Sequence, residues 1–389
     1  MKQSRRNHIL FLTRWYPHAY DPMFGLFVQR HAIAVGQYED VSVIYLHPVD
    51  GIEKSDIAYS ETAGVLEIIV YYPRPKFKIF LPFSFLLAFR RAFKNLVSLK
   101  SRPDLIHVNI LTRMGVPALM MKVLKGIPYI ITEHWSRYLP QNNSYSGRLR
   151  KRMTEWVVRR ASAVTTVTDN LRQAMENRGL KNSNYRVVPN VVNVNFFKPS
   201  ETKQDRNVKH LIHLSCFEER SKNMSGILRV VKRLSEKRSD FKLYMVGEGE
   251  DLESSIAMAE KMGLKDEFVV FTGLKEGEEL LKYMQMADLM VMFSHYENLP
   301  VVILEAFACG MPVISSDVGG IREHLTEERG KLLPPGDEEK FLDELDKILD
   351  RLDRFDSQSI RDYAIKHFSN EAIGKQFDDI YKKVLNQDG

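Results

Sequence analysis

Two glutamates, Glu297 and Glu305, form the arrangement in this chain that is best suited to chemistry. They lie in SHYENLPVVILEAFACGMPVISSDVGG (294–320), and an apolar run before Glu297 predicts a strand that ends there. Pro300 then suits the first turn of a helix, because the N–H that it lacks would have no partner in that turn. Glu297 is therefore expected in a loop and Glu305 on the helix that follows. Both would face the carboxyl ends of parallel strands, where open α/β sheets bind ligands.

Two glycines follow the glutamates at a place suited to an anion. The segment PVISSDVGGIREHL (312–325) predicts a short buried strand, a turn at Gly319 and Gly320, and a helix from about Ile321. Glycines without side chains, followed by free helix N–H groups, form a site for an anion such as phosphate. The alternative is a plain tight turn, with the nearby carboxylates placed only to suit the helix dipole.

The order of these residues resembles that of a known family. The spacing Glu, seven residues, Glu, followed by PVISSDVGG, is similar to that of the family 4 retaining glycosyltransferases of the GT-B fold. Further segments match the family in the same order: HVNILTRMG (107–115), ITEHWS (131–136), VVPNVVNVNFF (187–197), SCFEERSKN (215–223), YMVGEGEDL (244–252) and FTGLKEGEELLKYMQMADLMV (271–291). The resemblance covers nearly the whole chain. It implies the α/β fold class, with two doubly wound Rossmann-like domains that face each other across a cleft.

The resemblance implies a donor site on the second domain for a nucleotide diphosphate sugar, UDP- or GDP-linked. Lys222 resembles the family's phosphate lysine. The arginine that usually accompanies it is missing, because Ser215 and Cys216 stand where the family commonly has glycine and arginine, and Arg220 is expected to replace it. Glu305 resembles the carboxylate that binds the ribose, and an ionised carboxylate can accept hydrogen bonds from two vicinal hydroxyls.

The sugar itself is expected beside Glu297, which resembles the family's carboxylate that faces the hydroxyls of the transferred sugar. The backbone of Asn298 and Leu299 would lie beside the sugar and the phosphate. Gly319 and Gly320 would flank the donor on its other side.

Two residues of the first domain complete the expected site. His134, in ITEHWS, follows a predicted strand and resembles the family's active-site histidine, which contacts the donor sugar. Gly25 resembles the amino-terminal glycine whose backbone lies near the diphosphate and the acceptor, although its loop lacks the family's common double glycine.

These implications predict a retaining glycosyltransferase of the hexosyltransferase type. Its acceptor would be a saccharide or a lipid-linked saccharide, in the biosynthesis of a surface polysaccharide. No cofactor and no metal are expected, because the chain has no Asp-x-Asp motif in a strand context. The alternatives are a nucleotide-sugar 2-epimerase, which would react without an acceptor, and a non-catalytic nucleotide-sugar-binding module, which would bind the donor without turnover.

Apolar runs alternate with amphipathic segments along the chain, which is the pattern of βαβ units whose strands are buried on both faces. Strands are expected at 8–13, 41–46, 66–72, 104–109, 128–134 and 162–168, and again at 210–217, 241–249, 267–274, 289–294 and 312–317. A polar linker at about 193–209 contains Pro199. The pattern predicts an amino-terminal acceptor-side domain (1–195) and a carboxyl-terminal donor domain (208–360). A terminal helix (361–389) is implied by resemblance to cross back onto the first domain.

Charge is divided unevenly between the halves of the chain. Residues 1–200 hold 29 basic and 13 acidic residues, whereas the remainder holds 27 and 37. Segment 71–103 has eight basic residues, no acidic one and several phenylalanines, so we expect it to bind an anionic membrane surface. The alternative is a core helix with a solvated basic face. A nucleic-acid partner is not expected, because no basic helix, zinc finger or aromatic RNA-binding pattern is present.

The remaining features bear on location and redox chemistry. No apolar run approaches the roughly 20 residues that span a bilayer, and MKQSRRNHILFLTRW lacks the pattern of a signal peptide. A cytoplasmic protein, peripheral on the inner face of the cytoplasmic membrane, is therefore expected. Cys216 and Cys309 are the two cysteines, and both are expected to be packing residues rather than part of a disulfide framework or a zinc site.

Overall fold

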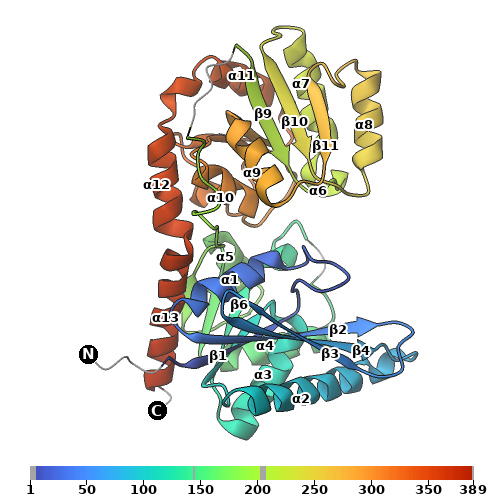
Figure 1. The fold of residues 1–389 in the computed structure, drawn as a ribbon, viewed down its shortest axis with the longest axis vertical. Helices are drawn as coiled ribbons and strands as arrows, with labels where there is room; N and C mark the ends of the chain where they lie inside the picture. The colour runs from blue at the N-terminus through green and yellow to red at the C-terminus, as the bar shows by residue number, and fades with distance from the viewer. Residues whose placement is uncertain (1–5, 143–144, 202–206, 388–389) are drawn as a thin grey trace. The chain divides into compact units, whose positions relative to one another are not determined.

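The computed structural model describes residues 6–142, 145–201 and 207–387. Part of the predicted linker (202–206) and the end of the predicted terminal helix (388–389) lie outside these residues. The chain divides into two compact units. Unit 1 comprises Met1–Val191 with Asn370–Gly389, and unit 2 comprises Val192–Ser369 (Figure 1).

Unit 1 is built on a sheet whose described residues form eight strands in the order β3-β4-β2-β1-β5-β6-β7-β8. All of its strand pairs are parallel except β3 with β4. The strands are β1 (His8–Thr13), β2 (Asp40–Val49), β3 (Asp56–Thr62), β4 (Val65–Pro73), β5 (Leu105–Asn109), β6 (Tyr129–Glu133), β7 (Ala163–Thr166) and β8 (Tyr185–Val187). The central strands β1, β5, β6 and β7 are buried at every position, as continuous apolar runs predict for parallel strands covered on both faces.

Helices connect most of these strands in the βαβ manner, whereas β2, β3 and β4 follow one another without a helix between them (Figure 1). Those of unit 1 are α1 (Leu26–Gly36), η1 (Lys78–Phe80), α2 (Leu81–Leu99), α3 (Leu111–Lys125), η2 (Ser136–Tyr138), α4 (Arg148–Arg160), α5 (Asp169–Asn177) and α13 (Asn370–Gln387). In α2 the side chains of Phe85, Phe89 and Leu96 are buried one to two turns apart, so this helix presents one apolar stripe to the core.

Unit 2 repeats the plan with a smaller sheet, whose described residues form six strands in the order β11-β10-β9-β12-β13-β14, all parallel. The strands are β9 (Lys209–Leu214), β10 (Phe241–Val246), β11 (Val269–Gly273), β12 (Leu289–Met292), β13 (Val313–Ser316) and β14 (Gly330–Leu333). The helices are α6 (Glu219–Lys222), α7 (Met224–Ser235), α8 (Leu252–Lys261), α9 (Gly277–Met286), α10 (Val301–Ala308), η3 (Ile321–Glu323), α11 (Glu338–Leu349), η4 (Leu352–Arg354) and α12 (Ser357–Phe368).

The predicted terminal helix is two helices, α12 and α13. The helix stops at Ser369, whose extended backbone (φ −62°, ψ 158°) cannot continue it. In α13, Ile373, Phe377 and Tyr381 belong to the hydrophobic core of unit 1. Gly374 brings α13 so close to α1 that an added Cβ would lie 2.2 Å from the Ala34 carbonyl oxygen.

Every strand predicted from an apolar run is present, but three strands were not predicted. β3 is an edge strand whose residues are exposed or partly exposed, so it has no buried run to detect. β8 and β14 also lie at the edges of their sheets, and neither is buried at every position. The sequence signal is weakest for edge strands without a continuous buried run.

Candidate functional site

The carboxyl edge of the unit 2 sheet gathers the loops that were predicted to bind the donor. β9 lies between β10 and β12, so the chain leaves β9 toward one side of the sheet and returns to β12 on the other. Such a reversal of strand order opens a crevice in which α/β proteins bind ligands. The connecting segments at this place follow β9 (215–223, which includes the short helix α6), β12 (293–300) and β13 (317–320).

An ion pair joins the first two of these loops. The Lys222 ammonium lies 2.6 Å from Oε1 of Glu297, and the two side chains are 16% and 10% exposed. The Ser294 hydroxyl donates a second hydrogen bond, of 3.0 Å, to the same carboxylate oxygen. Burial has the largest single effect and lowers the pKa of Lys222, but Glu297, Cys216 and Glu218 together outweigh burial and raise that pKa above its ordinary value, so the ammonium stays charged at neutral pH.

Backbone contacts hold Lys222 in place. The His295 N–H donates to the Ser221 carbonyl at 2.8 Å. Asn223 follows in the left-handed conformation (φ 55°), donates from its side chain to the Phe293 carbonyl, and caps α7 by accepting from the Gly226 N–H. An asparagine tolerates the left-handed conformation, and its side chain also caps the N-terminus of α7. The segment around Lys222 is therefore fixed relative to the loop after β12.

The two glycines approach the Glu297 loop closely. Gly319 has φ 60°, and an added Cβ would lie 2.3 Å from the Glu297 carbonyl oxygen and 2.7 Å from that of Asn298. The Gly320 N–H donates to the Asn298 carbonyl at 2.8 Å. The helix predicted from Ile321 begins at that residue, but it is only η3, a single 3-10 turn of three residues. Gly319 packs closely against the backbone of the Glu297 loop.

The other predicted donor residues differ in exposure. Leu299 and Glu305 are each only 4% exposed, and Glu305 lies on α10, which begins directly after Pro300 as predicted. Arg220 is exposed on the short helix α6.

Cys309 is buried as expected, but the expectation that Cys216 is a packing residue is wrong. Cys216 is exposed because it lies in the loop after β9 rather than in the strand.

In unit 1, His134 lies where the sequence predicts it, directly after β6. His134 is 8% exposed, and its ring Nε2 lies 3.1 Å from Oδ1 of Asn109. Its ring centroid is 4.8 Å from that of Phe27 and 5.1 Å from that of His31. Burial, with a smaller contribution from His31, lowers the pKa of His134 well below its ordinary value, so the imidazole is neutral at pH 7.

The residue before it, Glu133, was not predicted as a site residue. Its carboxylate accepts backbone hydrogen bonds from Leu111, His134 and Trp135 at 2.9–3.2 Å. Burial raises the pKa of Glu133 to about 7, against the opposing effect of these N–H groups. Glu133 therefore ties the start of α3 to the His134 loop.

This carboxyl should make the stability of the protein depend on pH. Since the pKa of Glu133 is raised from 4.5 in the unfolded chain to about 7 on folding, its contribution is fully present below pH 4.5 and is lost as the pH rises through 7. Relative to Glu133→Gln, the wild type should lose up to ~3 kcal/mol of unfolding free energy between pH 5 and pH 8. Urea titrations at several pH values measure this difference. The exposed Glu155→Gln is the control, and parallel curves for wild type and Glu133→Gln would contradict the prediction.

Gly25 precedes α1 with φ 71°, and an added Cβ would lie 2.4 Å from the Trp15 carbonyl carbon. We expect Gly25→Ala to lower the free energy of unfolding by ~2 kcal/mol or more, because a left-handed alanine and a backbone clash add together. The control is Gly64→Ala, which has φ 81° but no atom within 4 Å of the added Cβ. Thermal unfolding of both variants measures the difference. Equal melting temperatures would contradict the prediction and show that the backbone at Trp15 moves to accommodate the methyl group.

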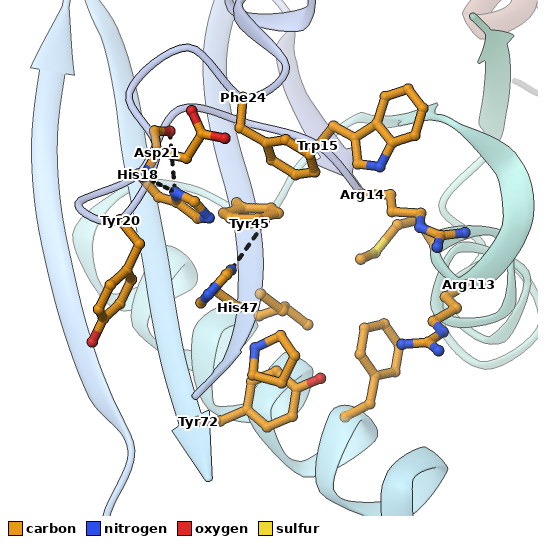
Figure 2. Close-up of a pocket in the computed structure, with 14 residues that line it drawn as sticks. Arg14, Trp15, His18, Tyr20, Asp21, Phe24, Tyr45, His47, Tyr72 and Arg113 are labelled. Carbon is orange, nitrogen blue, oxygen red and sulfur yellow. Dashed lines mark hydrogen bonds between the residues drawn. The ribbon is translucent and has the colours of Figure 1, made fainter. Parts of the chain in front are cut away.

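A cavity that the sequence analysis missed lies at the corresponding place in unit 1. It has a volume of about 450 Å³ and lies beyond the carboxyl ends of β4, β2, β1 and β5, where the strand order reverses. Figure 2 shows Arg14 and Arg113 on one side of it and His18, Tyr20 and His47 on the other. The available signal was the repeated use of aromatic and histidine residues at or directly after the ends of predicted strands, in RWYPHAY (14–20), YLHP (45–48) and YYPR (71–74).

The backbone at the edge of this cavity is strained. Ile110, between β5 and α3, has φ 63°, which is rare for a β-branched residue. Its N–H donates to the Thr132 carbonyl at 2.9 Å, which secures the conformation. The turn starts α3 at Leu111, so that Arg113 in its first turn lines the cavity. Strain of this kind is concentrated at binding and catalytic sites.

Comparison with known proteins assigns the chain to a family. Residues 196–367 match the model described as glycosyl transferases group 1, and residues 37–196 match the model described as glycosyltransferase family 4. The chain belongs to the family 4 glycosyltransferases. It is therefore a glycosyltransferase enzyme with the GT-B fold, and the predicted family and fold class are confirmed.

Several relatives illustrate the breadth of this glycosyltransferase family. The chain is 26% identical over 306 residues to an N-acetyl-α-D-glucosaminyl L-malate synthase of Bacillus anthracis (75% of this chain, 78% of the relative). It is 25% identical over 283 residues to a Bacillus subtilis protein whose name places it in teichuronic acid biosynthesis (71% of this chain, 67% of the relative). Among solved structures it resembles a sucrose-phosphate synthase from Thermosynechococcus elongatus (TM-score 0.78, 20% identity, 98% and 100% covered). It also resembles Anabaena HepE in complex with UDP and glucose (TM-score 0.72, 16% identity, 97% and 100% covered).

Two observations on the glycosyltransferase concern metals and membranes. In the described ranges, no three His, Cys, Asp or Glu side chains are grouped so that they could hold a metal ion. Within the same ranges, no helix combines the length and the apolar character needed to cross a bilayer.

Proposed function

We propose that this glycosyltransferase moves a sugar from a UDP- or GDP-linked donor to a saccharide or lipid-linked saccharide, with retention of the anomeric configuration. The Lys222–Glu297 pair at the strand-order reversal of unit 2 is the observation that carries this proposal. A charged ammonium is suited to the diphosphate, and the adjacent carboxylate is suited to sugar hydroxyls. The HepE structure with UDP and glucose supports UDP as the first donor nucleotide to test.

In the proposed reaction the bond between the anomeric carbon and the diphosphate oxygen breaks. The acceptor hydroxyl forms its bond on the same face, and its proton passes to a diphosphate oxygen. Lys222 would stabilise the negative charge that develops on the departing diphosphate, which is the largest electrostatic demand of the step. Glu297 would then be released from Lys222 to accept hydrogen bonds from the sugar. The neutral His134 would donate or accept a hydrogen bond without adding charge.

Nucleotide binding is the direct test. UDP, GDP, ADP and CMP are added to the wild type in thermal unfolding, with and without excess EDTA. A ligand at 100 times its Kd adds about 2.7 kcal/mol, which shifts the melting temperature by several degrees. We expect UDP to give the largest shift, EDTA to leave it unchanged, and sugar release from UDP-sugars to require an acceptor. No shift with any nucleotide would refute the donor site, and conversion of the donor without acceptor would favour the epimerase.

We further propose that segment 71–103 binds an anionic membrane surface. Its exposed apolar side chains are Phe77 (71%), Ile79 (81%), Phe80 (55%), Phe83 (68%) and Leu87 (57%). Exposed cations Arg90, Arg91 and Lys94 follow on α2. Apolar groups beside cations suit an interface of acyl chains and anionic headgroups. Co-sedimentation with phosphatidylglycerol vesicles should exceed that with phosphatidylcholine vesicles and fall in Ile79→Ser/Phe83→Ser. Equal recovery with both vesicles would refute this proposal.

A further inference from the structure

Unit 1 contains two cavities that share residues. The first is the cavity at the strand-order reversal, with a volume of about 450 Å³. The second, of about 470 Å³, lies among η1, α2, α3 and α4. Phe85 on α2 and Arg113 on α3 line both. The cavities therefore adjoin, and Arg113 stands where one meets the other.

The chemistry of the two cavities differs. Trp15, Phe24 and Tyr72 give the first cavity aromatic surfaces, while Asp21 and His47 give it polar groups. Aromatic faces with a few polar groups suit a saccharide, and the volume is within the ~300–1,000 Å³ typical of small-molecule sites. The second cavity is lined mainly by apolar side chains from three helices: Leu81, Leu86, Val116, Leu149, Met153 and Val157. That surface suits a hydrocarbon chain.

Positive charge gathers at the junction. Arg14 and Arg113 line the first cavity, and Arg113 and Arg150 line the second. Neither Arg14 nor Arg113 forms an ion pair with any other residue that the structure describes. Burial, followed by repulsion from Arg113 and Arg137, lowers the pKa of Arg14 below its ordinary value. Arg14 is partly buried, whereas Arg113 and Arg150 are exposed. Guanidinium groups that repel one another at one place favour an anion, and their fork geometry matches phosphate.

We propose that the two cavities form one acceptor site for a saccharide joined through a phosphate or diphosphate ester to a hydrocarbon chain. This inference rests on the proposed function, whose acceptor it narrows. The saccharide occupies the aromatic cavity, the phosphate ester lies against Arg113 with Arg14 and Arg150, and the first part of the chain lies among α2, α3 and α4. The exposed apolar residues of η1 and α2 adjoin the second cavity through Lys78 and Leu81, so the rest of the chain can remain in a membrane.

The probe is farnesyl diphosphate, which has both the anionic and the apolar part, with inorganic diphosphate and farnesol as its separate halves. Isothermal titration calorimetry of the full chain measures the three affinities. Farnesyl diphosphate should bind at least tenfold more tightly than either half, because it alone occupies the junction and the apolar cavity together. Equal affinity for farnesyl diphosphate and diphosphate would overturn the inference.

Variants separate the two parts of the site. Arg113→Ala should weaken farnesyl diphosphate and diphosphate alike, by about tenfold or more, and Arg113→Lys should restore part of the loss because it keeps charge without the fork. Met153→Glu should weaken farnesyl diphosphate but leave diphosphate unchanged. The controls are Arg159→Ala and Leu124→Glu, at exposed positions of α4 and α3 outside both cavities. Wild-type affinity for farnesyl diphosphate in Arg113→Ala would overturn the inference.

Two further experiments identify the source of the phosphate group and distinguish failure of this inference from failure of the proposed function. Soluble dihexanoyl phosphatidylglycerol should not displace farnesyl diphosphate, and equal competition would show a general phospholipid site instead of an acceptor site. UDP should stabilise Arg113→Ala as it stabilises the wild type, because the predicted donor residues around Lys222 lie in unit 2. If UDP stabilises the wild type and farnesyl diphosphate does not bind, only this inference fails. If farnesyl diphosphate binds and no nucleotide does, the proposed function fails.

Discussion

Lys222→Ala is expected to lower kcat/KM for sugar transfer by about 10²–10³, the size of effect found when one preorganised charge-stabilising group is removed. The ammonium is charged, the Lys222 side chain is 16% exposed, and the contacts of Ser221 and Asn223 fix the backbone on either side of it, so little reorganisation is needed when the diphosphate departs. The loss should fall mainly on kcat, since charge on the diphosphate is greatest in the transition state. Initial rates over a range of donor concentrations measure the split between kcat and KM.

The same substitution has a structural effect that must be separated from catalysis. Removing Lys222 leaves the Glu297 carboxylate with the hydrogen bond from the Ser294 hydroxyl but without its counter-ion, and a buried charge that loses its counter-ion can cost ~3–5 kcal/mol. Lys222→Met/Glu297→Gln should therefore be more stable than Lys222→Met alone. Lys222→Arg keeps the charge and serves as the matched control for activity. A kcat/KM within tenfold of the wild type in a folded Lys222→Ala would place the diphosphate elsewhere.

Much of the fold could be predicted because parallel strands carry their signal locally. β1, β5 and β13 are buried at every position and consist mostly of apolar and small residues, so each could be recognised in the sequence. β3 could not be found in this way, because its residues face solvent and its place is set by hydrogen bonds to β4. The break at Ser369 was missed for a similar reason, since the residues on both sides of it are helical in pattern.

The candidate site was predictable where chemistry depends on residue type and order. Lys222 and Glu297, 75 positions apart, were each proposed from a motif, and the structure adds that they form a direct ion pair. The packing role of Gly319 could not be predicted from the sequence, because its close approach to Glu297 depends on how two loops pack together. The cavity of unit 1 was missed because its lining comes from the loop after β1, the ends of β2 and β4, and the starts of α2 and α3, and no single segment contains the whole pattern.

Glu305→Gln is expected to raise the Kd for UDP by about 100-fold if Glu305 accepts hydrogen bonds from both ribose hydroxyls. A hydrogen bond to a charged group is worth ~1.5–3 kcal/mol, and glutamine keeps the shape of the side chain but removes the charge and one acceptor. Glu305 is 4% exposed on α10, so bulk water cannot replace the lost partner.

A nucleotide without those hydroxyls makes the test specific to the ribose. The wild type should bind UDP far more tightly than 2′,3′-dideoxy-UDP, whereas Glu305→Gln should bind the two with nearly equal affinity, because neither complex then has the charged hydrogen bonds. Glu297→Gln is the matched control, since its carboxylate is proposed to face the sugar: it should lose turnover and keep the wild-type preference for UDP over the dideoxy nucleotide. Calorimetric titration of both nucleotides into the three proteins gives the ratios. If Glu305→Gln kept the wild-type ratio, Glu305 would act by supporting α10 rather than by binding the ribose.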